Sequence, residues 1–96
     1  MKMIFIAYSE SIEEEVMEIL SGGEIEGYSK WTQVLGSGRS SGPHLATAVW
    51  PKANNMLMIC TEEKQARQVM DGVRSLRLTM GHEGVKAFSW EIEEVT

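Results

Sequence analysis

Lys2-Met-Ile-Phe-Ile-Ala-Tyr8 carries apolar side chains at both alternating positions of an extended chain, and so does Met56-Leu-Met-Ile-Cys60. In a β-strand, successive side chains point to opposite faces of the sheet. A strand that is apolar on both faces belongs in the middle of a covered sheet. These two stretches therefore predict the central strands of one sheet.

Each central strand is followed by a helical pattern. After the first, Ser11 and Glu14 form an S-x-x-E capping box, and Gly22-Gly23 mark the end of the helix. Its apolar face consists of Ile12, Val16, Ile19 and Leu20, and its solvated face carries Glu13, Glu14, Glu15 and Glu18. After the second strand, Thr61 is the predicted N-cap and Gly81 the stop. The apolar face of that helix consists of Ala66, Val69, Met70, Val73, Leu76 and Met80.

The other strands have weaker patterns. Residues 28–35 predict a second strand, 45–50 a short returning strand, and 85–95 a final edge strand with Phe88 and Trp90 on one parity. The order β-α-β-β-α-β predicts one α+β domain over residues 1–96, a ferredoxin-like sandwich with a four-stranded antiparallel sheet and two helices on one face. Because the central strands are also apolar on the opposite face, we expect self-association to cover it.

The amino-acid composition argues against several classes of function. The formal net charge is −5, and no stripe of Lys and Arg exists to bind a phosphate backbone, which argues against a nucleic-acid partner. The single cysteine, Cys60, cannot form an internal disulfide, so we expect a cytoplasmic protein. No acid–base pair or nucleophile with a supporting partner is recognisable, and we predict that the protein is not an enzyme.

A glycine-rich stretch separates the second strand from the returning strand. Gly36-Ser-Gly-Arg-Ser-Ser-Gly-Pro43 contains no large apolar residue and predicts a loop. Three glycines around one arginine could bring backbone N–H groups and a guanidinium to a phosphate or carboxylate. The alternative is a hairpin tip whose glycines only relieve strain, and the pattern alone favours this simpler interpretation.

Metal binding has little support in the sequence. The potential ligands His44, His82 and Cys60 are scattered, and we predict no metal site: we interpret the histidines as solvated or capping residues, and Cys60 as an inert core thiol. Seven methionines could suggest a soft metal, but we interpret them as packing residues.

Several stretches together resemble the PII family of nitrogen-regulatory signal proteins, over nearly the whole chain. They are Ile25-Glu-Gly-Tyr28, Val34-Leu-Gly-Ser-Gly-Arg39, Trp50-Pro-Lys52 and Gly84-Val-Lys-Ala-Phe88. The resemblance implies a homotrimer with inward-facing sheets and an adenine nucleotide, ATP or ADP, in the clefts between subunits. It places Gly36, Gly38 and Arg39 at the loop base against the nucleotide, and Gly84 and Lys86 near its phosphates.

The resemblance also implies that the loop from Gly36 to His44 contacts a regulated target protein, such as a membrane transporter. The contact residues would be Ser37, Ser40, Ser41, Gly42, Pro43 and His44. The loop is shorter than in the family, and Ser40 replaces the glutamine that helps to hold 2-oxoglutarate. The alternative function is a metal-responsive trimer similar to CutA-type proteins, linked to heavy-metal efflux or tolerance and using His44, His82 or Cys60.

Overall fold

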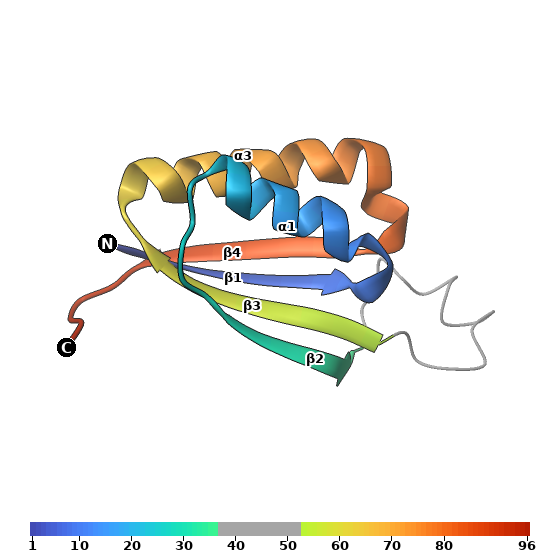
Figure 1. Ribbon diagram of the computed structural model, residues 1–96, viewed down its shortest axis with the longest axis horizontal. Helices are drawn as coiled ribbons and strands as arrows, with labels where there is room; N and C mark the ends of the chain where they lie inside the picture. The colour runs from blue at the N-terminus through green and yellow to red at the C-terminus, as the bar shows by residue number, and fades with distance from the viewer. Residues whose placement is uncertain (37–52) are drawn as a thin grey trace.

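The computed structural model describes residues 1–36 and 53–96. Its elements follow the order β1 (Lys2–Ser9), η1 (Glu10–Ile12), α1 (Glu13–Gly22), β2 (Ser29–Leu35), β3 (Ala53–Thr61), α3 (Glu63–Met80), η3 (Gly81–Glu83) and β4 (Val85–Glu91). Both α-helices lie on one face of the sheet (Figure 1). The predicted α+β fold is confirmed, whereas the returning strand at 45–50 lies outside the described residues.

The four strands form one antiparallel sheet in the order β2-β3-β1-β4. The two strands predicted to be central, β1 and β3, are central and pair from Lys2↔Thr61 to Ser9↔Asn54. β4 is an edge strand as predicted, but it ends at Glu91 rather than at Val95. No helix within residues 1–36 or 53–96 is long and apolar enough to cross a membrane.

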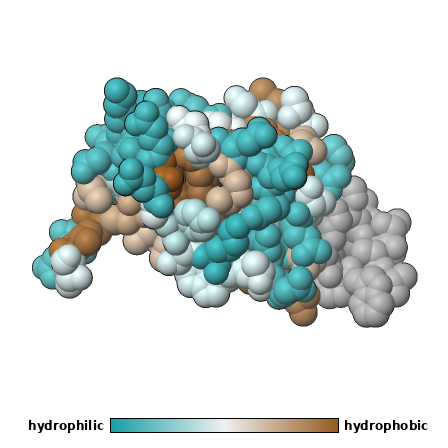
Figure 2. Space-filling view, in the orientation of Figure 1, coloured by the Kyte–Doolittle hydropathy of each residue, from teal (hydrophilic) through white to brown (hydrophobic). Residues whose placement is uncertain are grey.

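The core lies between the sheet and the helices. One parity of each central strand is buried there, and both predicted apolar helix faces meet it. The buried residues are Ile4, Ile6, Tyr8, Ile12, Val16, Leu20, Leu57, Ile59, Ala66, Val69, Val73 and Val85. Glu14 and Glu18 on the outer side of α1 are exposed. The surface in Figure 2 is mostly hydrophilic, around a small hydrophobic hollow near the centre of the view.

The other parity of the strands forms what we call the open face, the side of the sheet opposite α1 and α3. Strand pairing aligns its side chains in rows: Cys60–Met3–Trp90, Ser29–Met58–Phe5–Phe88, and Trp31–Met56–Ala7–Lys86. Trp31 and Phe88 are each 48% exposed and Trp90 is 44% exposed. The aromatic parity of β4 thus points away from the helices, because Val85 and Ala87 occupy the helix side.

The sequence interpretation was wrong about Cys60 and about the capping box. Cys60 is exposed on the open face rather than buried as a core thiol, because the parity of β3 that meets the helices is that of Leu57 and Ile59. The capping box is also absent. Ser9, not Ser11, caps the η1 turn by accepting a hydrogen bond from the Ser11 N–H at 3.3 Å.

The helix ends agree better with the sequence than the helix starts do. α1 ends at Gly22 with Gly23 as its C-cap, and α3 ends immediately before Gly81. At the start of α3, Glu62 is the N-cap rather than Thr61, whose hydroxyl instead donates to the Gln65 side chain at 2.8 Å.

Candidate functional site

The described residues among the predicted ligand contacts lie at one end of the sheet. Gly36 follows the last residue of β2, which pairs with the first residue of β3. Gly84 precedes β4, whose first residue pairs with Tyr8 near the end of β1. Lys86 is in the same part of β4. Gly38, Arg39 and the predicted partner-contact residues Ser37, Ser40, Ser41, Gly42, Pro43 and His44 lie outside the described residues.

Within this end of the sheet, Gly36 and Gly84 occupy opposite edges. β2 and β4 are the edge strands, with β3 and β1 between them. Three strand spacings separate their backbones by ~14 Å. Main-chain groups this far apart cannot both contact one phosphate. A ligand that uses both positions of one chain must be extended; otherwise a second chain completes the site.

Gly84 lies in the tight turn that connects α3 and η3 to β4. Its φ is +90°, a conformation that side chains other than glycine rarely adopt. Its N–H donates to the Gly81 carbonyl at 3.1 Å, and its carbonyl accepts from the Ser9 N–H at 2.9 Å. The turn therefore brings β4 to β1 with both backbone groups of Gly84 already engaged.

Lys86 is exposed on the open face, and its ammonium lies 5.8 Å from the centroid of the Phe88 ring. Among the described residues, no carboxylate pairs with it. Gly36 is exposed at the end of β2, where an added Cβ would lie 2.9 Å from the Asn54 amide nitrogen. A side chain at position 36 would therefore require the Asn54 side chain to move. Lys86 offers a positive charge for an anion.

A polar cluster that the sequence analysis missed lies beneath α1 at the same end of the sheet. The Glu13 carboxylate accepts hydrogen bonds from the Tyr8 hydroxyl, the Lys30 ammonium and, at 3.0 Å, the Asn55 amide. Sequence analysis placed Glu13 on the solvated helix face, but it is only partly exposed. The available signal was that Tyr8 and Asn55 continue the buried, otherwise apolar parities of their strands.

Hydrogen bonds within the cluster favour one charge state for each of its two titratable groups, Glu13 and Tyr8. Burial by itself raises the pKa of Glu13, but hydrogen bonds from Lys30, Tyr8 and Asn55 outweigh it and hold that pKa below its ordinary value. Burial, followed by the hydrogen bond and charge of Glu13, raises the pKa of Tyr8 well above that of a free tyrosine. Near neutral pH, Glu13 is ionised and Tyr8 protonated. The cluster therefore suits joining a helix to three strands rather than proton transfer.

Of the three potential metal ligands, Cys60 and His82 do not come together. Cys60 aligns with Trp90 at the far end of β4, whereas His82 lies in η3 before the start of that strand, with its Nε2 3.4 Å from Glu83 Oε1. His44 is outside the described residues. Across the described part of the chain, no three His, Cys, Asp or Glu side chains are grouped to hold a metal ion.

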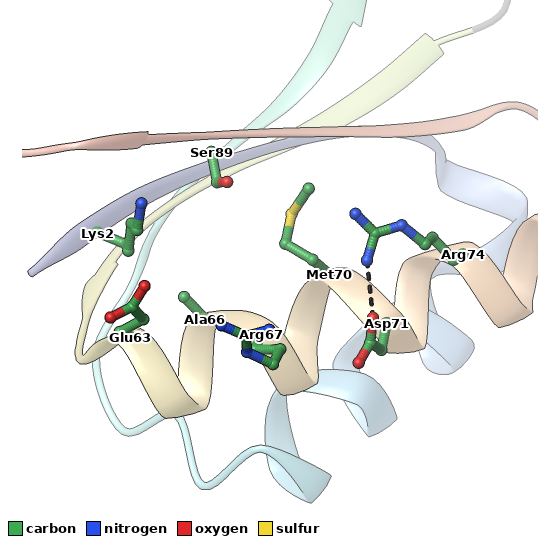
Figure 3. A pocket seen from close by; sticks show the side chains of 8 residues that line it. All are labelled: Lys2, Glu63, Ala66, Arg67, Met70, Asp71, Arg74 and Ser89. Carbon is green, nitrogen blue, oxygen red and sulfur yellow. Dashed lines mark hydrogen bonds and ion pairs between the residues drawn. The ribbon is translucent and has the colours of Figure 1, made fainter.

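A shallow pocket of about 250 Å³ lies between α3 and the opposite end of the sheet (Figure 3). Ala66 and Met70 supply its apolar lining. Charges of both signs surround it, including Lys2, Arg67 and the pair of Arg74 with Asp71 at 2.7 Å. The described residues among the predicted ligand contacts, Gly36, Gly84 and Lys86, do not line this pocket.

Comparison with known proteins supports the fold and indicates a family. The family model described as nitrogen regulatory protein P-II matches residues 1–96. CPII from Thiomonas intermedia K12, a nitrogen regulatory PII-like protein solved with ADP, AMP and bicarbonate, superposes with a TM-score of 0.72 at 15% identity, covering 95% of this chain and 88% of CPII. A putative PII-like signaling protein from Thermus thermophilus gives a TM-score of 0.64 at 21% identity, covering 93% of this chain and 83% of that protein. A search of curated proteins gave no match.

Proposed function

The chain belongs to the nitrogen regulatory protein P-II family, and from this premise we propose that it is a cytoplasmic signalling protein rather than an enzyme. It forms a homotrimer, binds an adenine nucleotide at the clefts between subunits, and reports nucleotide occupancy to a target protein. The observation that carries the proposal is the family match over the whole chain, together with an apolar open face that residues 1–36 and 53–96 of one chain leave exposed.

The open face supports the homotrimer. Three aromatic side chains, Trp31, Phe88 and Trp90, are each about half exposed there, beside methionines of β1 and β3. Monomeric proteins rarely expose a contiguous apolar surface of this kind, whereas permanent interfaces are built from it. Sister subunits that pack these faces together remove the apolar surface from water.

The arrangement of the ligand residues supports a nucleotide. Gly36 and Gly84 are separated by ~14 Å across the end of the sheet, which suits an extended molecule or a site shared by two chains. Lys86 supplies a charge without a carboxylate partner among the described residues. Gly38 and Arg39 are the proposed further contacts at the loop base. The similar CPII was solved with ADP bound.

The segment from Gly36 to His44 is the proposed contact with the target protein, for which a membrane transporter is one class. Its position in the sequence supports this role, because its first residues, Gly36, Gly38 and Arg39, are also proposed nucleotide contacts. A ligand bound at Gly36 would then lie next to the segment that the target protein contacts.

Native mass spectrometry and thermal unfolding test the proposal. We expect the mass of a trimer, and a rise in Tm when ADP or ATP is added. ADP at 100 times its Kd should stabilise the fold by about 2.7 kcal/mol. Lys86→Ala should weaken ADP binding, whereas Lys64→Ala, a charge change on the exposed side of α3, should not. A stable monomer whose Tm ignores millimolar nucleotides would refute the proposal.

A further inference from the structure

The geometry points to a second binding site, on the open face. We propose that the sulfur atoms of Met3, Met58 and Cys60 bind a soft monovalent metal ion, Cu(I) or its redox-inert analogue Ag(I). All three ligands belong to one chain, so the site does not depend on the proposed nucleotide function.

Strand pairing places the three sulfur side chains together. Met3 and Cys60 are direct partners across β1 and β3, and Met58 is paired with Phe5, one step along the same face. Directly opposite side chains have their Cβ atoms ~4.5–5.5 Å apart, and diagonal neighbours stand ~7–8 Å apart. Methionine has three rotatable bonds, so its thioether can close such a gap. Cys60 is exposed, and the two methionines are partly exposed.

The donor set selects the metal. One thiolate with two thioethers is a soft set that favours Cu(I), whereas Mg²⁺ and Ca²⁺ require oxygen ligands. The neighbouring side chains in these rows are Phe5, Phe88, Trp90 and Ser29. None of them offers a carboxylate or an imidazole, and the neutral hydroxyl of Ser29 is a hard ligand that does not compete with sulfur for a soft metal. Zn²⁺ would find a single strong ligand here, because thioethers are poor substitutes for its usual Cys and His.

Binding requires loss of the thiol proton. The Cys60 S–H gives up its proton to solvent as the metal–sulfur bond forms, and the oxidation state of the metal is unchanged. The apparent affinity should therefore increase with pH. If sister subunits cover the open face, the three sulfur clusters lie in the interior of the assembly, out of contact with competing water.

Metal competition with matched variants tests the site. The reduced, full-length protein is titrated with Cu(I) against the chromophoric chelator bicinchoninate under anaerobic conditions, and with Ag(I) by native mass spectrometry. We expect one ion per chain. Cys60→Ser and the double variant Met3→Leu/Met58→Leu should each weaken binding by roughly tenfold or more. Leucine replaces methionine with little change in volume, so packing is retained.

The control removes two thioethers from the helix side instead. Met17 and Met70 pack partly buried against the core, so Met17→Leu/Met70→Leu should bind as the parent does. Equal losses in both double variants, unchanged binding by Cys60→Ser, or Zn²⁺ binding as tight as Cu(I) would overturn the proposal. The native mass of each variant reports assembly separately, so loss of the metal site is distinguishable from failure of the trimer.

Discussion

The side-chain amide of Asn55 donates to the Glu13 carboxylate at 3.0 Å. Together with Tyr8 on β1 and Lys30 on β2, Asn55 on β3 makes Glu13 a helix residue that joins three adjacent strands. Buried polar groups need such partners, because an unsatisfied group loses its hydration without compensation. Asn55 Oδ1, by contrast, has no partner among the described residues.

Removal of the Glu13 carboxylate should destabilise the fold. Glu13→Ala leaves the buried Tyr8 hydroxyl and the Asn55 amide without their acceptor, at an expected cost of about 2–3 kcal/mol in the free energy of unfolding. Urea denaturation at fixed protein concentration measures this. Glu14→Ala, one residue along and exposed, should change the value by less than about 0.5 kcal/mol. Equal effects of the two substitutions would contradict the role of the cluster.

The Glu13 carboxylate should also make the free energy of unfolding depend on pH in the acidic range. Because the folded-state pKa of Glu13 lies below its unfolded value of about 4.3, its contribution is present above that unfolded value and is lost as the pH falls through the folded pKa. The stability difference between the parent and Glu13→Gln should therefore be largest near pH 7 and shrink below about pH 4. Glu18→Gln is the control. A difference that is constant with pH would show that the charge of Glu13 contributes nothing.

Tyr8 should make the folded state less stable at alkaline pH. Its pKa is raised in the folded state by burial and by Glu13, so above about pH 10 the unfolded chain releases a proton that the folded chain retains. Stability should fall with increasing pH there in the parent and less so in Tyr8→Phe. Tyr28, which is 45% exposed, provides the matched Tyr28→Phe control. The measurement is the urea midpoint at about pH 8 and about pH 10.5, on either side of the unfolded tyrosine pKa. Identical alkaline slopes for parent and Tyr8→Phe would refute the prediction.

A charge on the open face should prevent assembly without unfolding the chain. Phe88 is aligned with Phe5 and Met58 and is half exposed in the single chain, so Phe88→Glu loses little internal packing but would bury a charge between subunits. Sedimentation velocity should show a smaller species. Leu78→Glu is the control, because Leu78 is 87% exposed on α3, away from the open face. An unchanged sedimentation coefficient for Phe88→Glu would place the subunit interface elsewhere.

Much of the fold follows from local patterns along the chain. Both central strands were predicted correctly because β1 and β3 carry apolar residues at both parities, and glycines marked the ends of α1 and α3. The start of each helix was misplaced by the same kind of reasoning. Ser11 fits a capping box, but its hydroxyl instead donates to Glu83 at 2.8 Å, a residue 72 positions away that no local pattern reveals.

Periodicity along the chain, which depends only on neighbouring residues, was enough to establish the order of strands and helices and to indicate that one sheet face would need covering. Periodicity did not determine which parity of β3 and β4 meets the helices. The helices α1 and α3 can cover only one side of the sheet, and their contacts join distant parts of the sequence. Tertiary packing therefore exposed Cys60 beside Met3 and enclosed Glu13 among three strands. Those placements depend on which face of each strand meets the helices, which residue spacing alone does not encode.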